Sequence, residues 1–211
     1  MMIVFRVDAS STIGTGHVMR CLTLAKELEK QGAKCKFICR DLKDNLIEKI
    51  KTENFNVSIL NNSKTYSNWL GANYNEDALQ TINALNNEVI DWLIIDHYGI
   101  EKKWEKKLRP TVRNIMVIDD LANRDHDCDL LLDQNLVRNF KIRYQDILPK
   151  SCNTLLGPEY ALLQREYKNF HTAAPTRIGP TKNILVYFGG MSHYYLTELV
   201  FLQVNLEFLK L

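Results

Sequence analysis

The alternation of short apolar runs with amphipathic segments constrains the fold of this chain more than any other feature. The apolar runs, each expected to form a strand, are residues 2–7, 34–39, 55–60, 91–96, 114–119, 128–133 and 153–157. The segments between them that have helical patterns are residues 17–31, 41–51, 76–86 and 101–109. Strands of nearly continuous apolar character separated by helices are typical of a parallel sheet covered on both faces. We therefore predict an α/β fold with a Rossmann-like, doubly wound parallel sheet.

The composition changes at residues 171–181, "HTAAPTRIGPT", where two prolines and a glycine predict a linker. We therefore assign residues 1–170 to an N-terminal domain. "KNILVYFGG" (182–190) repeats the pattern of a strand followed by glycines, so we expect residues 182–211 to be the start of a second domain that is cut short. The tail favours a helix at "LTELVF" but alternates like a strand at "LQVNLEF". If segment 196–211 is exposed, its apolar residues would promote self-association.

Composition and charge argue against several classes of function. The chain has 211 residues, of which 27 are basic and 25 acidic, and its net charge of +2 gives no indication of binding to nucleic acid or to an anionic membrane. No apolar run approaches the roughly 18 residues of a membrane span, and no signal peptide is evident. The five cysteines form no C-x-x-C pair, which favours free thiols in a reducing compartment. We therefore expect a soluble cytoplasmic protein.

The stretch "TIGTGH" that follows the first predicted strand resembles a nucleotide-binding loop only in part. Gly14 and Gly16 match the first two glycines of G-x-G-x-x-G, but Met19 occupies the third position. The second predicted strand ends without the acidic residue that would bind a ribose, and no G-K-[ST] follows the loop. The glycines therefore predict a sharp strand-to-helix turn at the carboxyl edge of the sheet, where such folds bind ligands.

His17 is placed by this turn at the start of the following helix. The apolar stripe of that helix consists of Val18, Cys21, Leu22, Ala25 and Leu28. The partial positive charge of a helix N-terminus disfavours an imidazolium, so we expect a neutral ring that can accept a proton as a general base. The alternative is that His17 only packs against the turn or caps it.

Other polar residues lie at the same predicted edge of the sheet. Asp8 is expected to accept amide hydrogen bonds within the glycine loop, and Arg20 either lies on a solvated helix face or reaches the site. Residues 96–98, "DHY", end another strand. The segment 118–135 adds Asp119, Asp120, Arg124, His126 and Asn135. Its carboxylates lack the ligand spacing of a zinc or two-metal site, so we expect most of them to cap strand ends and no metal to bind.

Five separated segments resemble, in order, those of one bacterial enzyme family. They are "RVDASSTIGTGHVMRCLTLAKEL", "IDHYGI", "IDDLANRDHDCDLLLDQN", "LLGPEYALLQREY" and "ILVYFGG". The family is that of the UDP-2,4-diacetamido-2,4,6-trideoxy-β-L-altropyranose hydrolases of pseudaminic acid biosynthesis. The resemblance covers roughly residues 1–190 and implies the N-terminal half of a GT-B fold, similar to that of MurG.

The resemblance also implies a reaction and a set of site residues. Water would replace UDP at the anomeric carbon with inversion, without a metal or other cofactor, and His17 would be the base. Tyr98 would position sugar or water, and Asn135 would line the site. Gly14 and Gly16 would let the backbone approach the substrate, and Arg20 is assigned to substrate binding as well. The absent second domain would supply most of the uridine diphosphate contacts.

Two other functions stay open on the sequence. Another GT-B glycosyltransferase would share the arrangement of the N-terminal domain, but it would transfer the sugar to an acceptor. An inactive remnant would fold and act at most as a binding or interaction module. The sequence gives no oligomeric state beyond the association suggested for the tail.

Overall fold

The computed structural model describes the chain except for residues 63–68, 177, 181–183, 187–193 and 209–211. The described residues divide into two compact units, Met1–Leu163 and Gln164–Leu211. The first unit contains the sheet and is the larger of the two. The boundary lies after Leu163, earlier than the predicted domain end at residue 170.

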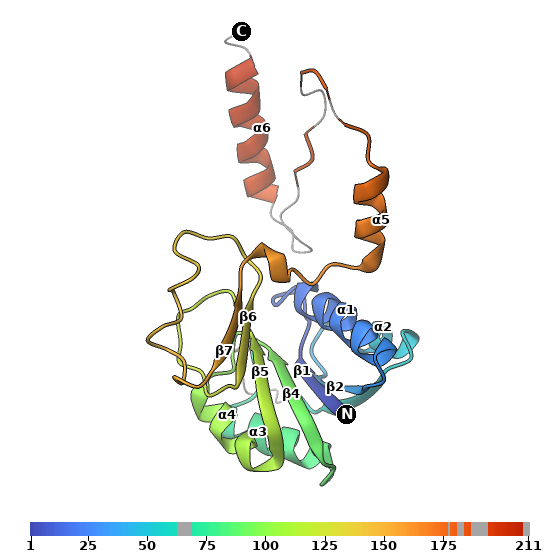
Figure 1. The fold of residues 1–211 in the computed structure, drawn as a ribbon, viewed down its shortest axis with the longest axis vertical. Helices are drawn as coiled ribbons and strands as arrows, with labels where there is room; N and C mark the ends of the chain where they lie inside the picture. Colours follow the sequence, from blue (N-terminus) through green and yellow to red (C-terminus); the bar gives the residue numbers. More distant parts are fainter. Residues whose placement is uncertain (63–68, 177, 181–183, 187–193, 209–211) are drawn as a thin grey trace. The chain divides into compact units, whose positions relative to one another are not determined.

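A seven-stranded parallel sheet forms the centre of the first unit, in the order β3-β2-β1-β4-β5-β6-β7 (Figure 1). The strands are β1 (Met2–Val7), β2 (Lys34–Arg40), β3 (Asn56–Leu60), β4 (Ile90–Asp96), β5 (Val112–Ile118), β6 (Leu130–Asp133) and β7 (Asn153–Leu156). The chain runs outward from β1 to β3 and then crosses back to continue at β4. This order and orientation confirm the predicted Rossmann-like α/β fold.

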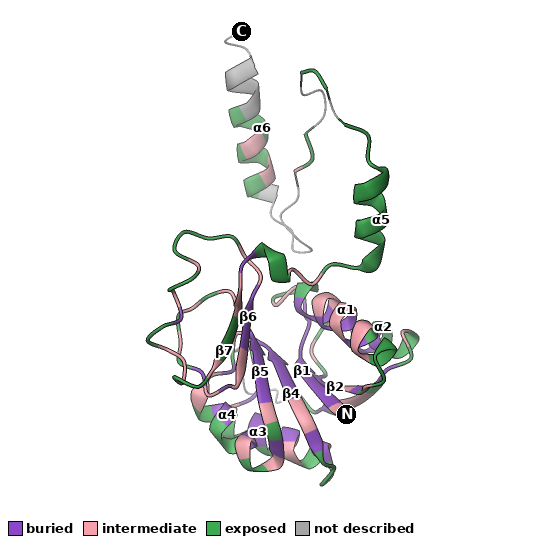
Figure 2. Cartoon of the chain, in the orientation of Figure 1, coloured by how far each residue is buried: buried purple, intermediate pink, exposed green. Residues whose placement is uncertain are grey.

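Helices cover both faces of this sheet, as a doubly wound fold requires. On one face, α1 (Gly16–Lys30) and α2 (Ile47–Thr52) bury Val18, Cys21 and Ile50 in a core cluster with β1 and β2. On the other face, α3 (Tyr74–Leu85) and α4 (Lys102–Leu108) bury Leu85 and Trp104 in a second cluster. The central strands are buried along most of their length between these two layers (Figure 2).

The predicted helix over residues 41–51 is wrong in its first half. Helix α2 spans only Ile47–Thr52, because Asp44 has a φ of 59°, which a right-handed helix does not allow. The side chain of Asn45 then accepts a hydrogen bond from the backbone N–H of Ile47 and helps to start the helix. The charged pattern of this segment resembled a helix, but a left-handed residue interrupts it.

The second unit contains α5 (Arg165–Ala173) and α6 (Tyr194–Phe208). Helix α5 includes residues 171–173, so the predicted linker begins inside a helix. The tail that sequence left open between helix and strand is helical in α6, where the backbone satisfies its own hydrogen bonds without a neighbouring strand. Of the strand predicted at 182–190, residues 184–186 lie outside any strand, and the others lie outside the described residues.

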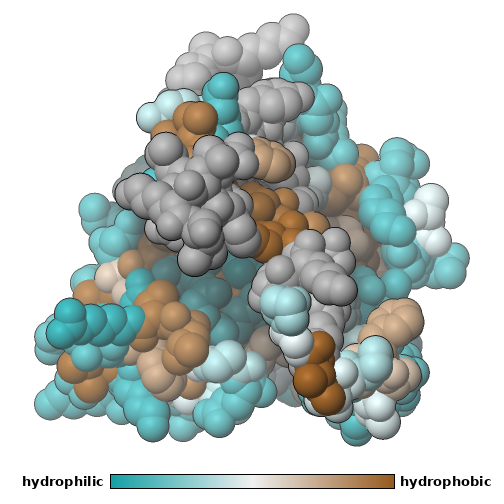
Figure 3. Space-filling model, turned by 90° about the horizontal axis from the view of Figure 1, so that it is seen from above, coloured by the Kyte–Doolittle hydropathy of each residue, from teal (hydrophilic) through white to brown (hydrophobic). Residues whose placement is uncertain are grey.

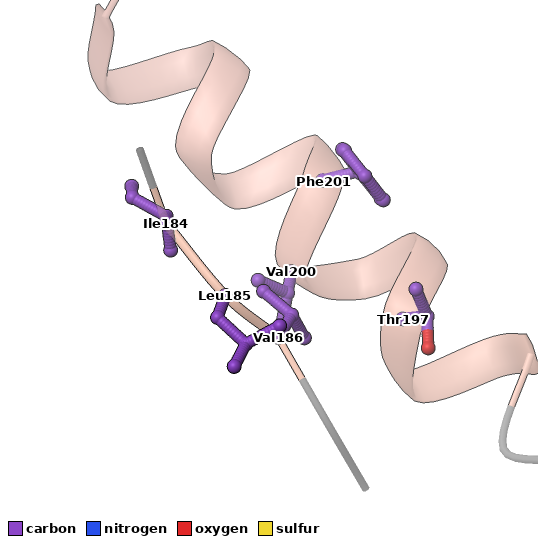
Figure 4. Close-up of a pocket in the computed structure, with 6 residues that line it drawn as sticks. All are labelled: Ile184, Leu185, Val186, Thr197, Val200 and Phe201. Carbon is purple, nitrogen blue, oxygen red and sulfur yellow. The ribbon is translucent and has the colours of Figure 1, made fainter. Parts of the chain in front are cut away.

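Exposed apolar side chains are frequent in this second unit. Helix α6 exposes Tyr195, Leu199, Phe201 and Leu202. A cavity of about 310 Å³ lies between α6 and residues 184–186 (Figure 4). It is lined by Thr197, Val200 and Phe201 of α6 and by Ile184, Leu185 and Val186. On the face of the molecule shown in Figure 3, hydrophobic residues occur in separate groups among hydrophilic ones. Self-association through the tail stays a prediction, as does the start of a second domain at residue 182.

Candidate functional site

The candidate site lies where the strand order reverses, between β1 and β4. In open parallel sheets, the loops after two such strands diverge toward opposite faces and leave room for a ligand at the carboxyl edge. The loop after β1 leads into His17 of α1, and β4 ends at Asp96, followed by Tyr98. The loops after β5 and β6 add Asp120 and Asn135 at the same edge. The fold thus brings together residues that are far apart in the sequence.

The glycine loop before α1 is held by its own backbone and by Ser10. The N–H of Gly14 donates to the carbonyl of Ser10 at 2.8 Å, and the Ser10 hydroxyl accepts from the N–H groups of Thr12 and Ile13. Gly14 has a φ of +85°, so the turn needs a glycine there. A Cβ on Gly16 would meet no atom within 4 Å. Open space, rather than strain, surrounds the first residue of the helix.

His17 forms a close pair with a carboxylate from the neighbouring strand. Its Nδ1 lies 2.6 Å from Oδ1 of Asp96, whose side chain is fully buried, while the side chain of His17 is 8% exposed. An ionised carboxylate only accepts hydrogen bonds, so Nδ1 carries the proton in this pair. In the neutral ring, Nε2 is then the nitrogen with the free lone pair. Among the described residues, no hydrogen-bond partner is found for Nε2. The geometry is that of an oriented general base.

Arg20 shares the same carboxylate. Its Nε and Nη2 reach the two oxygens of Asp96 at 2.5 and 2.6 Å, a bidentate ion pair in a largely buried place. Burial alone would raise the pKa of Asp96, but the hydrogen bonds and charge of Arg20, followed by the hydrogen bond of His17, hold that pKa well below its usual range. Asp96 therefore stays ionised. Arg20 is not on a solvated helix face, and two of its three guanidinium nitrogens are engaged before any substrate arrives.

Tyr98 contacts the other side of the histidine. Its ring meets the ring of His17 edge to face, with centroids 4.6 Å apart and an interplanar angle of 86°. The indole of Trp69 lies 5.3 Å away from the Tyr98 ring, and the Arg124 guanidinium lies 6.0 Å from its centroid. Burial, together with hydrogen bonding to Asp120, raises the pKa of the Tyr98 hydroxyl far above its ordinary value. Tyr98 is therefore a neutral phenol at physiological pH.

Asp120 connects two of the predicted site residues. The Asp120 carboxylate contributes to the raised pKa of the Tyr98 hydroxyl, and the side-chain amide of Asn135 donates to its Oδ2 at 3.3 Å. The backbone N–H of Asn135 also donates to Asp133 at 3.0 Å, which fixes the turn after β6. Tyr98 and Asn135, predicted separately, thus both interact with Asp120. The sequence expectation that treated Asp120 as one strand-end cap among several missed this link.

The role expected for Asp8 is wrong. Ser10 accepts the amide hydrogen bonds of the glycine loop, whereas Asp8 accepts from the backbone N–H of Arg40 and from Nη1 of Arg6, both at 2.7 Å. Asp8 belongs to a fully buried charge cluster in which Arg6 and Arg40 also bind Asp77. Burial would raise the pKa of Asp8, but the charge of Arg6 keeps it far below the usual range. Asp8 also lies 3.3 Å from Nε2 of His97, which follows Asp96 in the chain.

The remaining polar residues of the edge are structural. His97 follows the end of β4, where its Nδ1 accepts from the N–H of Gly99 and its Nε2 lies 3.3 Å from Oδ2 of Asp8. Asp119 accepts from the backbone N–H of Ala122 and from the Tyr144 hydroxyl. His126 is buried against Glu105, with Nδ1 and Oε1 2.7 Å apart. Within the described ranges, no group of three or more His, Cys, Asp or Glu residues has the arrangement of a metal site.

The comparison with curated proteins finds distant similarity to a sugar-nucleotide hydrolase. The chain is 32% identical over 169 residues to the UDP-2,4-diacetamido-2,4,6-trideoxy-β-L-altropyranose hydrolase of Campylobacter jejuni, a match that covers 79% of this chain and 53% of that protein. It is 27% identical over 202 residues to an uncharacterized protein of Methanocaldococcus jannaschii, covering 93% of this chain and 38% of that protein. The chain thus spans about half or less of the length of these relatives.

The comparisons with family models and with solved structures say less about function. No model of a known protein family matches the chain. Among solved structures, MurG of Acinetobacter baumannii superimposes with a TM-score of 0.48 at 11% identity, over 74% of this chain and 44% of that one. No helix in the part of the chain that the structure describes is long and apolar enough to cross a bilayer.

Two contributors to the site were not predicted as such. Asp96 carries a recognisable signal, because a carboxylate that ends a buried strand must find a partner at the carboxyl edge. Trp69 has none, since it lies in a polar connection between β3 and α3. The contact between Trp69 and Tyr98 is evident only in the folded structure.

Proposed function

We propose that this chain hydrolyses a UDP-linked 2,4-diacetamido-2,4,6-trideoxy sugar, releasing UDP and the free sugar. Distant similarity to the Campylobacter jejuni hydrolase supplies the substrate class. The observation that carries the proposal is the His17–Asp96 pair, which places an oriented imidazole at the ligand-binding edge of a Rossmann-like sheet.

His17 acts as the base in this proposal. Nε2 takes a proton from a water molecule, whose oxygen forms a bond to the anomeric carbon as the bond from that carbon to the UDP oxygen breaks. UDP leaves with the bonding electron pair, and the configuration at the carbon is inverted. Asp96 holds the ring in the tautomer that leaves Nε2 free and stabilises the imidazolium that forms. UDP is a good leaving group, so the reaction needs no strong protein acid.

Other residues position the reactants. Tyr98 presents a neutral hydroxyl that can exchange a hydrogen bond with water or with a sugar hydroxyl. Asn135 lines the site beside it, and Arg20 offers its remaining guanidinium N–H groups to the substrate. Gly16 leaves room for close approach at the start of α1. Gly14 shapes the turn, while its own N–H is engaged with Ser10.

The experiment measures UDP release from the UDP-linked diacetamido-trideoxy sugar by the purified chain, with proton NMR of the product to record its anomeric configuration at early times. The proposal predicts UDP release and a free sugar of inverted configuration. Retention of configuration would contradict a single displacement by water. Transfer of the sugar to an added acceptor, without free sugar, would identify a glycosyltransferase instead. If no UDP appears, the chain by itself does not have the proposed activity.

A further inference from the structure

The edge of the site next to Tyr98 carries a large exposed aromatic side chain. Trp69 is 45% exposed, yet its indole contacts the Tyr98 ring at a centroid distance of 5.3 Å and a tilt of 44°. Tyr98 in turn contacts His17. Exposed tryptophan is costly in water, because its large apolar surface remains hydrated. An exposed indole beside a candidate base is therefore a feature that needs an explanation.

The backbone after Trp69 is firmly anchored. Leu70 is 3% exposed and packs in the core cluster on the α3 and α4 face of the sheet. Gly71 has a φ of +63°, and a Cβ there would come within 2.8 Å of the Arg40 side chain. Leu70 also lies against Gly99, the residue after Tyr98. The backbone directly after Trp69 thus packs against the loop that carries Tyr98, and the indole contacts the Tyr98 ring.

The other side chains around His17 are charged or polar. Arg20, Asp96, Asp120 and Asn135 supply hydrogen bonds and charge, whereas Trp69 and Tyr98 supply the apolar surface. Small-molecule sites combine a few polar groups with aromatic walls in this way. The division predicts a ligand that has one polar side and one apolar side.

We infer that Trp69 is a specificity-determining residue that stacks against the apolar face of the sugar. This inference rests on the proposed function. A 2,4-diacetamido-2,4,6-trideoxy sugar carries a methyl group at C6 and two acetamido methyl groups, and it has fewer hydroxyls than an ordinary hexose. Such a sugar presents more C–H surface to an indole, which favours contact through dispersion and burial of apolar area. A hexose that keeps its C6 hydroxyl would leave that hydroxyl without a hydrogen-bond partner against the aromatic rings.

The kinetic test compares the wild type with Trp69→Ala and Trp69→Phe, using the UDP-linked diacetamido-trideoxy sugar and UDP-N-acetylglucosamine. For Trp69→Ala we expect KM for the first substrate to rise about tenfold while kcat changes little, so that the preference for the trideoxy sugar falls by the same factor. Trp69→Phe retains a ring and recovers part of this loss. Trp92→Phe is the matched control, because Trp92 is a half-buried tryptophan of β4 that packs against the core. Unchanged KM and unchanged preference in Trp69→Ala would overturn the inference.

A binding measurement separates this inference from the proposed reaction. In the His17→Ala variant, the intact UDP-sugar is added while tryptophan emission is recorded, with UDP alone as the second ligand. For the His17→Ala variant we expect a blue shift of the emission with the UDP-sugar and none with UDP. For the double variant that also carries Trp69→Phe we expect no shift with either ligand. Trp104 is fully buried and reports little of either ligand. If the wild type releases no UDP but the shift occurs, the reaction fails and the role of Trp69 stands. UDP release by the wild type without any shift contradicts the role of Trp69 alone.

Discussion

Nδ1 of His17 lies 2.6 Å from Oδ1 of Asp96, and Arg20 binds the same carboxylate through two nitrogens. The histidine comes from the first turn of α1 and the aspartate from the end of β4, and the parallel pairing of β1 with β4 brings them together. In the proposed reaction Asp96 orients the base, and the guanidinium of Arg20 balances the charge of Asp96. The consequences of this arrangement can be tested one residue at a time.

Asp96→Asn should reduce the rate of UDP release by about 10²-fold or more per folded molecule. An amide at this position can donate to Nδ1, which moves the ring proton to Nε2 and removes the lone pair that accepts a proton from water. Glu105→Gln is the matched control, since Glu105 is also a buried carboxylate 2.7 Å from a histidine Nδ1. Rates are divided by the folded fraction measured by circular dichroism. Equal losses in both variants would indicate a structural role for Asp96.

The two loop glycines should respond differently to alanine. Gly14→Ala forces a Cβ onto a backbone with a φ of +85° and should lower the free energy of unfolding by about 1 kcal/mol. Gly16→Ala should leave stability unchanged or slightly raised, because its Cβ meets no atom within 4 Å and alanine favours helix. If the substrate approaches this backbone, KM rises in Gly16→Ala at unchanged stability. Denaturant unfolding measures the stability of both variants, and initial rates give the KM of Gly16→Ala. Equal losses of stability in Gly14→Ala and Gly16→Ala would contradict the predicted difference between the two glycines.

Asp77→Asn should lower the free energy of unfolding at neutral pH by about 3–5 kcal/mol. Asp77 binds Arg6 and Arg40 and accepts from Nε1 of Trp104, all of them buried. Burial alone would raise the pKa of Asp77, but the charge and hydrogen bonds of Arg6, followed by Arg40, lower it.

Because the folded pKa is the lower one, Asp77 stabilises the protein above its unfolded pKa of about 3.9 and loses this effect as the pH falls through the folded value. The wild type should therefore lose stability in acid more steeply than Asp77→Asn. Glu88→Gln, which breaks the surface pair with Lys36, should change stability much less at any pH. Parallel pH curves for the wild type and Asp77→Asn would contradict the assignment.

Cys152 should be the thiol that reacts first with an alkylating reagent. It is half-buried, and the hydrogen bond from Cys128, whose Sγ lies 3.6 Å away, lowers its pKa. Burial raises the pKa of Cys21 and Cys39, which lie inside the core. Mass spectrometry after brief labelling should find one modified cysteine, and Cys152→Ser should abolish the fast phase. Fast labelling of Cys21 or Cys39 in the native protein would contradict the packing of that core.

Much of the fold followed from the sequence because the pattern of apolar runs depends on local residues. The seven strands predicted between residues 2 and 157 all exist within a few residues of their expected bounds, whereas residues 184–186 form no strand. The failure at 41–46 has a local cause as well, the left-handed Asp44, which hydropathy does not reveal.

The site was less accessible to sequence reasoning, because its contacts join residues that are distant along the chain. His17 could be proposed from its position at a helix start, but its partner Asp96 is 79 residues away. The same holds for Asp120, which joins Tyr98 to Asn135, and for Trp69 beside Tyr98. Asp8 was expected to accept the amide hydrogen bonds of the glycine loop, but Ser10, two residues later, accepts them.

The most direct test of the central claim is the rate of UDP release from the UDP-linked diacetamido-trideoxy sugar by the wild type and by His17→Ala. His171→Ala, which alters an exposed histidine of α5, is the control. We predict that the wild type and His171→Ala release UDP at the same rate, and that His17→Ala is slower by about 10²–10⁴-fold at unchanged stability. A folded His17→Ala variant that releases UDP as fast as the wild type would show that His17 is not the base.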